Sequence, residues 1–191
     1  MLVLSQVQSR GVLGGSDEFV ELYNPTSGPV TFDASWTVKA RSATGGVAQC
    51  ANAAMTTRFA GAGQIIPAHG HILHANPGYS GVTPPDGTYT TGIPDAAAVV
   101  LVHGTTTVDA LCFYYDQSTL GALTTCATAY PCEGTPVQNP HNNTSGSNVD
   151  TSLERLPGGA AGNAVDNNNN AGDFVVTSPS NPRNLASPPA P

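Results

Sequence analysis

Short runs of β-forming residues, each closed by glycine, proline or asparagine, recur along the whole chain, and no stretch sustains the apolar period of an amphipathic helix. Only 10% of the residues are charged, whereas glycine (21) and proline (16) are abundant among 191 residues. This pattern predicts an all-β protein without long ion-paired helices. The length suits one domain with a sizeable core.

The clearest strand signals lie near the N-terminus. Residues 2–7 (LVLSQV) and 17–23 (DEFVELY) flank a glycine-rich turn, so we expect them to form a hairpin. In the second run, Val20 and Leu22 share one face, which we expect to be core. The other face of the same run carries Phe19, Glu21 and Tyr23.

Further runs predict more strands. The apolar run 97–102 and its return at 107–111 predict a central hairpin covered on both faces. Trp36, the only tryptophan, is expected to be buried in the core of a sandwich. The remaining predicted strands are residues 30–32, 36–38, 65–67, 71–75, 152–156 and 173–176.

Two segments lack a strand pattern. Residues 115–150 show little regular pattern and are interpreted as a long loop held by disulfide bonds, which in a compact domain is usually functional or an insertion. Residues 178–191 are proline-rich and are expected to be extended, without sheet hydrogen bonds of their own. We therefore predict a sandwich domain over residues 1–177 and an extended tail over 178–191.

The four cysteines contain no Cys-x-x-Cys pair, which argues against a zinc knuckle and a thioredoxin-like redox site. Two disulfide bonds are predicted, and all three pairings remain open. Paired thiols and few charges are typical of a secreted or cell-surface protein; four buried thiols in a cytosolic protein are the alternative. The cysteines are Cys50, Cys112, Cys126 and Cys132.

The sequence contains no nucleophile elbow, His-Glu-x-x-His zinc motif, phosphate loop or dinucleotide-binding glycine pattern. We therefore predict no catalytic residue, no cofactor and no enzymatic activity. Several carboxylates are interpreted as strand-end and turn residues that accept hydrogen bonds from backbone amides. They are Glu18, Glu21, Asp109, Glu154 and Asp173.

Histidines cluster before and within one predicted strand. His69 and His71 share a strand face and His74 lies on the opposite one, with only His103 or His141 as a further metal ligand. A zinc site needs three or four protein ligands, so we predict no metal. We expect these histidines to face solvent and to tune an interface with pH.

Polar residues 166–173 place oxygens at alternate positions, as calcium loops do. Ala171 stands where such a loop needs glycine and Thr177 where it needs a bidentate glutamate, so we predict an asparagine-rich turn with left-handed backbone. Arg155 and Glu154 are interpreted as an ion pair on a strand face. Asn142 and Asn143 start overlapping N-glycosylation acceptor patterns, which matter only where the host glycosylates them.

Four groups of segments together resemble the bacterial lamin tail domain family, and they span nearly the whole chain. They are residues 2–7; 17–25 with 36–38; 108–109; and 152–155 with 166–168 and 173–175. The resemblance implies a secreted immunoglobulin-like β-sandwich, used as a non-catalytic module alone or attached to extracellular hydrolases and nucleases. The chain departs from the pattern at the three histidines and in an enlarged loop at 115–148.

The net charge of −7 disfavours nucleic-acid binding, and no apolar run is long enough to span a membrane. We expect a structural protein that associates with copies of itself at the cell surface, with a filament as one form of assembly. Edge strands and the proline-rich tail, seated in a groove of a neighbouring copy, are the expected contacts. The alternative is an accessory module that attaches a secreted hydrolase or nuclease to a surface or polymer.

Overall fold

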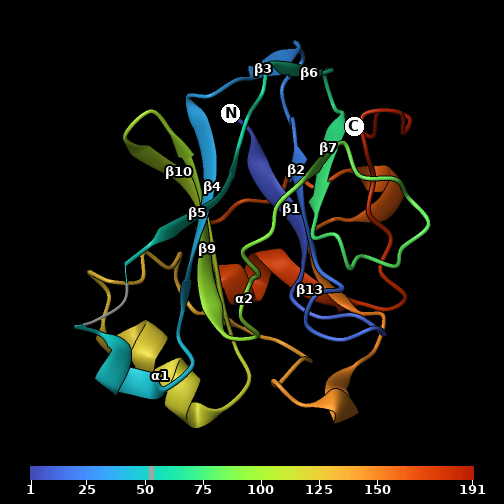
Figure 1. Cartoon of the computed structure of the whole chain (residues 1–191). Coiled ribbons are helices and arrows are strands. Elements are labelled where there is room, and N and C mark those ends of the chain that lie inside the picture. Colours follow the sequence, from blue (N-terminus) through green and yellow to red (C-terminus); the bar gives the residue numbers. More distant parts are fainter. Residues whose placement is uncertain (52–53) are drawn as a thin grey trace.

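The computed structural model describes residues 1–51 and 54–191, and it contains two β-sheets packed face to face (Figure 1). One sheet has the strand order β13-β12-β1-β2-β7-β8 and the other the order β11-β10-β9-β4-β5. Strands β3 and β6 form a separate two-stranded ribbon. The prediction of an all-β sandwich is therefore confirmed.

The strands of the six-stranded sheet are β1 (Val3–Gln8), β2 (Phe19–Tyr23), β7 (His71–Ala75), β8 (Gly87–Thr88), β12 (Ser152–Arg155) and β13 (Phe174–Thr177). Those of the five-stranded sheet are β4 (Trp36–Ser42), β5 (Thr56–Ala60), β9 (Ala97–His103), β10 (Thr106–Tyr114) and β11 (Val137–Gln138). The ribbon consists of β3 (Val30–Phe32) and β6 (Gln64–Ile66). Helical segments are η1 (Gly46–Gln49), α1 (Gln117–Thr125), η2 (Ser145–Ser147), η3 (Gly159–Ala161) and α2 (Asn170–Asp173).

All the predicted strands are present. β1 and β2 form the expected antiparallel hairpin, and β9 lies at the centre of its sheet between β10 and β4. Three strands were not predicted. β8 and β11 have only two residues each, and β5 (TTRFA) carries Arg58 and lacks a clear alternation.

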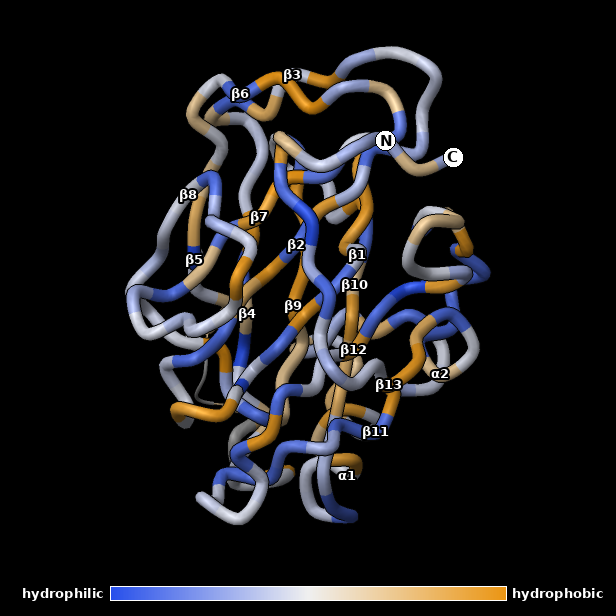
Figure 2. Tube along the Cα trace, turned by 90° about the vertical axis from the view of Figure 1, so that its right-hand side faces the viewer, coloured by the Kyte–Doolittle hydropathy of each residue, from blue (hydrophilic) through white to orange (hydrophobic). Residues whose placement is uncertain are grey.

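The core fills the space between the sheets. Strands β2 and β7 contribute Leu22 and Ile72 from one sheet, and β9 contributes Val99 and Leu101 from the other. Figure 2 shows the resulting concentration of hydrophobic residues on the central strands. Trp36 is 5% exposed, which confirms the prediction that it is buried.

The prediction of a long irregular loop over residues 115–150 is wrong at its start, where α1 lies. Asp116 and Thr119 form a capping box at the N-terminus of this helix. Ala122 and Leu123 pack against Cys112, but the helix has too weak an apolar period to be seen in the sequence. The disulfide bonds Cys112–Cys132 and Cys50–Cys126 attach this segment to β10 and to the residues that follow η1.

The predicted surface ion pair between Arg155 and Glu154 is also wrong, because neighbouring strand residues point to opposite faces. Arg155 points into the protein, where it is 0% exposed, and its Nη2 donates to both carboxylate oxygens of Asp109 at 2.7 Å. The guanidinium carbon lies 4.6 Å from the centre of the Phe174 ring. Burial raises the pKa of Asp109, and the Arg155 charge opposes this effect.

This buried ion pair connects the two sheets at two β-bulges. The pairing register shifts between Leu4 and Gln6 in β1 and between Thr107 and Asp109 in β10. Leu4 donates its N–H to Asp109 Oδ2 at 2.6 Å, and its carbonyl accepts from Arg155 Nε at 2.7 Å. Both backbone groups of Leu4, next to the bulge in β1, are therefore bound to the ion pair.

We predict that Asp109→Asn lowers the free energy of unfolding by about 3–5 kcal/mol, because it leaves the buried Arg155 charge without its partner. Asp166→Asn is the matched control. Its carboxylate lies 3.7 Å from Arg155 Nη1 but is 34% exposed, so the loss should stay under about 1 kcal/mol. Urea unfolding measures both. Equal losses for the two variants would contradict the importance of the buried pair.

Candidate functional site

The outer face of the six-stranded sheet carries a cluster of polar residues that is buried under the C-terminal tail. In β2, Val20 and Leu22 enter the core as predicted, while Glu21 and Tyr23 face outward. All five residues of β2 are nevertheless buried. Both faces of this strand are therefore covered, one by the other sheet and one by segments distant in sequence.

Glu21 is at the centre of the cluster and is 2% exposed. One carboxylate oxygen accepts a hydrogen bond from Ser5 Oγ at 2.5 Å, and the other accepts the backbone N–H of Arg183 in the tail. Burial raises the pKa of Glu21 to about 8, although both hydrogen bonds act in the opposite direction. The Glu21 carboxyl group therefore stays protonated at pH values well above the ordinary glutamate pKa of 4.5.

His71 lies beside Glu21, with Nε2 3.8 Å from Oε1 of the carboxyl group. Asn163 Nδ2 donates to the carbonyl of Arg155, which turns its Oδ1 toward His71 Nε2 at 2.9 Å. This network assigns the imidazole proton to Nε2. Burial lowers the pKa of His71 to about 4, so the ring is neutral at physiological pH.

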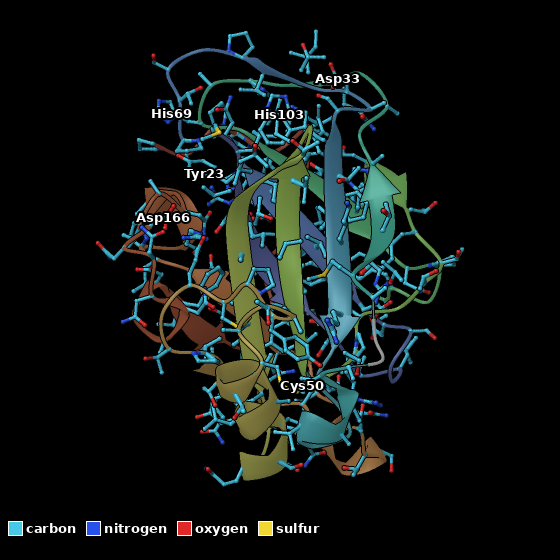
Figure 3. All side chains as sticks on the ribbon, turned by 90° about the vertical axis from the view of Figure 1, so that its left-hand side faces the viewer. Tyr23, Asp33, Cys50, His69, His103 and Asp166 are labelled. Carbon is cyan, nitrogen blue, oxygen red and sulfur yellow. A yellow bond between two sulfur atoms is a disulfide. The ribbon has the colours of Figure 1, made fainter. Side chains whose placement is uncertain are left out.

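The expectation of solvent-facing histidines is wrong for His71 and His74, which are 1% and 3% exposed. His74 enters the core and stacks on Phe59, with ring centroids 4.1 Å apart. His69 lies before β7 with φ of 57°, and its Nδ1 is 3.3 Å from the hydroxyl of Tyr23 (Figure 3). No local sequence pattern predicts that other segments of the chain cover both faces of β7.

The other two histidines do not join this group. His103 is exposed at the end of β9 and stacks on Trp36, with centroids 4.2 Å apart. His141 is buried, with its ring nitrogens 2.8 Å from the carbonyl oxygens of Ser147 and Thr151. Within residues 1–51 and 54–191, no group of three His, Cys, Asp or Glu side chains is arranged to hold a metal ion.

The cluster holds the tail rather than activating a nucleophile. The Ser5 hydroxyl is hydrogen-bonded to Glu21, but with a pKa raised to about 8 this carboxyl group is protonated at neutral pH and is not a base there. His71 Nε2 faces Asn163 and not Ser5. Tyr23 instead donates its hydroxyl to the carbonyl of Ala190 at 2.7 Å. The polar groups of this site therefore form hydrogen bonds to the backbone of the extended tail.

The tail runs along this face through several specific contacts (Figure 1). Leu185 donates its N–H to Asp86, Asn184 Nδ2 donates to the carbonyl of Pro84, and Ala190 donates its N–H to the carbonyl of His69. The tail is therefore held by a groove of its own chain, and a contact of the tail with a neighbouring copy stays a prediction. No residue pattern in the tail predicted its binding site.

The interpretation of the five selected carboxylates is confirmed in that each accepts a backbone N–H, but Glu21, Asp109 and Glu154 lie within strands and not at strand ends or in turns. The donors are Ile93 for Glu18, Arg183 for Glu21, Leu4 for Asp109, Gly159 for Glu154, and both Asn167 and Asn169 for Asp173. Burial also raises the pKa of Glu18 to about 7. These groups hold strands and turns in place.

The asparagine-rich turn predicted over residues 166–173 is confirmed for residues 166–169, whereas residues 170–173 form the short helix α2. Asp173 accepts hydrogen bonds from within the turn, and Asn168 has the left-handed φ of 54°. Asn142 and Asn143 are both exposed, so the two glycosylation patterns are accessible, and their use stays a prediction. Within the described part of the chain, no helix is long and apolar enough to cross a membrane.

Comparison with known proteins finds similarity among solved structures and none in sequence. No protein-family model matches the chain, and no curated protein matches its sequence. Among solved structures, it is similar to a DUF4876 family protein from Bacteroides thetaiotaomicron, with a TM-score of 0.50 and 14% sequence identity. The match covers 91% of this chain and 70% of that one. At this identity the likeness shows the fold alone.

We predict that the contribution of Glu21 to the stability of the folded protein is lost progressively as the pH rises from about 4.5 to 8. In this range the folded state holds protons on Glu21, with a pKa of about 8, that the unfolded state, with the ordinary value of 4.5, has released. Raising the pH therefore favours unfolding. Glu21→Gln removes this contribution, so its melting temperature, referred to its own value at pH 5, should fall less.

Thermal denaturation from pH 5 to 9 measures this difference. Asp33→Asn is the control, because Asp33 is an exposed carboxylate whose pKa is lowered mainly by hydrogen bonds from Ser35. It should reproduce the wild-type decline. Parallel curves for wild type and Glu21→Gln would show that Glu21 is ionised in the folded protein at neutral pH.

Proposed function

We propose that this chain is a non-catalytic extracellular structural protein, a β-sandwich subunit that associates with copies of itself at the cell surface. The assignment to the lamin tail domain family, with an immunoglobulin-like arrangement of strands, is part of this proposal. The two disulfide bonds fit a protein that acts in an oxidising environment. In this proposal, the polar residues buried under the tail around Glu21 have a structural role, because they hold one another and the tail in place.

The observation that carries the proposal is the open edge formed by β13. This strand is the last in its sheet and pairs only with β12 within the described residues. Val175 and Val176 are 41% and 51% exposed although they point to opposite faces of the strand. The strand has no charged residue, so an apolar edge with unpaired backbone groups is available to a neighbour.

The other edges of the two sheets are less suited to pairing. β8 and β11 contain two residues each. β5 is longer but carries Arg58 at its centre, and charged residues on edge strands oppose pairing. β13 is therefore the edge at which we place self-association.

The partner edge decides the form of the assembly. Pairing of β13 with β13 of another copy is isologous and closes a two-fold dimer. Pairing of β13 with a different surface of the next copy is heterologous, and it gives a ring if the rotation closes and a filament if it does not. The tail is engaged within its own chain, so it is free to contribute only if it leaves its groove.

A second candidate function is an accessory module that attaches a larger secreted hydrolase or nuclease to a surface or polymer. A cleft of about 220 Å³ beside the tail favours it, because a structural subunit has no need of a small-molecule site. The two functions are compatible if assembled subunits also bind a surface polymer.

We predict that Val176→Lys weakens self-association by at least about tenfold, because it places a charge in the contact between edges. Ile65→Lys is the matched control, since Ile65 is 63% exposed on the β3–β6 ribbon and lies outside both edges. Light scattering over a range of concentrations measures the assembly of each. A wild-type protein that stays monomeric at high concentration would contradict self-association, and equal effects of the two variants would contradict the role of β13.

A further inference from the structure

The five-stranded sheet carries a cleft of about 500 Å³ on the face that is turned to the viewer in Figure 3. Strands β4, β9 and β10 contribute to its lining, together with the turn at residues 104–105 and the segment 128–131, which follows α1. The volume lies within the roughly 300–1,000 Å³ that small-molecule sites have. The cleft is therefore large enough for an organic ligand.

Alternation along β4 places two positively charged residues in this cleft. Val38 and Ala40 belong to the core between the sheets, so Lys39 and Arg41, which alternate with them, point to the outer face. In the strand pairing, Lys39 lies opposite Val100 of β9. All three outward residues line the cleft.

Lys39 is the only lysine of the chain, and its ammonium group is accessible. The residue is partly exposed, and within residues 1–51 and 54–191 its Nζ forms no hydrogen bond or ion pair. Nζ is also not among the buried polar atoms that lack a partner in that part of the chain. The charged end of Lys39 is therefore open to a ligand.

Arg41 supplies a second positive charge, and its position is fixed. It is 8% exposed, and its Nη1 and Nη2 donate to the carbonyls of Ala129 and Cys50 at 3.2 and 3.0 Å. Its guanidinium carbon lies 4.7 Å from the centre of the Tyr130 ring. Residues two positions apart in a strand are separated by about 7 Å, so both charges act on a group bound at Lys39.

The lining of the cleft contrasts with the acidic character of the chain. The net charge is −7, yet none of the described residues that line the cleft is Asp or Glu. The carboxylate of Glu133, just beyond the lining segment, accepts the backbone N–H of Ala110 at 3.1 Å. The accessible polar groups beside Lys39 are the hydroxyls of Thr105, Thr107 and Thr128.

We infer that this cleft binds a ligand through a carboxylate group. The Lys39 ammonium offers three donors and a charge, and hydrogen bonds to ionised groups are the strong ones. The two positive charges oppose a cationic ligand. Phosphate is a poorer match, because its sites typically use several N–H groups at a helix N-terminus, and α1 begins at Gln117, outside the lining.

The rest of the ligand would contact hydroxyl groups and one apolar side chain. The threonine hydroxyls of the lining can donate to or accept from a hydroxyl-rich body such as a sugar acid. Met55 instead offers an apolar contact to a hydrophobic acid. Both ligands bring the same carboxylate to Lys39. This inference does not depend on self-association.

Titration of the whole chain with galacturonate and with phenylacetate, monitored by amide NMR spectra, tests the inference. Both acids should shift the amide signals of Lys39, Thr105 and Thr107, whereas the uncharged galactose and phenylacetamide should not. Tighter binding of galacturonate assigns the site to sugar acids, and tighter binding of phenylacetate assigns it to hydrophobic acids. Inorganic phosphate at equal ionic strength should not displace either acid.

Three variants complete the test. Lys39→Gln removes the accessible charge and should weaken binding of the tighter acid about tenfold, whereas Lys39→Arg keeps the charge and should bind within about threefold of wild type. Arg183→Gln removes the same charge from the tail, outside the cleft, and should leave binding unchanged. The inference is overturned if neither acid binds up to about 20 mM, if the uncharged analogues or phosphate bind as well, or if Lys39→Gln and Arg183→Gln bind equally.

Discussion

The two sheets of this protein are joined through one buried ion pair, between Asp109 of β10 and Arg155 of β12. Removing two charges from water is expensive, and such a pair is tolerable only when the remaining donors and acceptors are satisfied. Here Leu4 supplies both a backbone donor and a backbone acceptor, and Val165 supplies a further carbonyl. The pair and its backbone partners lie beside the β-bulges in β1 and β10, so irregular positions of both strands belong to the connection between the sheets.

The position of the ion pair also explains how the outer face is organised. Because Arg155 points inward, its neighbour Glu154 points outward, toward the face that the tail covers. Asn163 links the two layers, since its amide donates to the carbonyl of Arg155 and accepts from His71. The cluster around Glu21 then holds Arg183 of the tail. Beyond the tail, β13 remains the open edge of the same sheet.

The sequence predicted the parts of the fold that depend on local pattern. The strands around Val20 and Val99 and the turn at Asn168 follow from alternation, apolar runs and turn chemistry. The errors concern contacts between distant segments. The sequence pattern favours pairing of Arg155 with its neighbour Glu154, whereas its partner Asp109 lies 46 residues away. No local pattern indicates that His71 is buried, because the segments that cover it follow much later in the chain. Likewise, nothing local marks Lys39 and Thr128 as members of one cleft.

Native-state hydrogen exchange of the Leu4 amide tests the role of the ion pair most directly. This N–H points at Asp109 rather than into the sheet ladder, so it is protected only as long as the connection between the sheets holds. We expect it to exchange with the free energy of global unfolding, as core amides do. Exchange as fast as that of the exposed edge strand β13 would show that the ion pair opens locally and does not hold the sheets together.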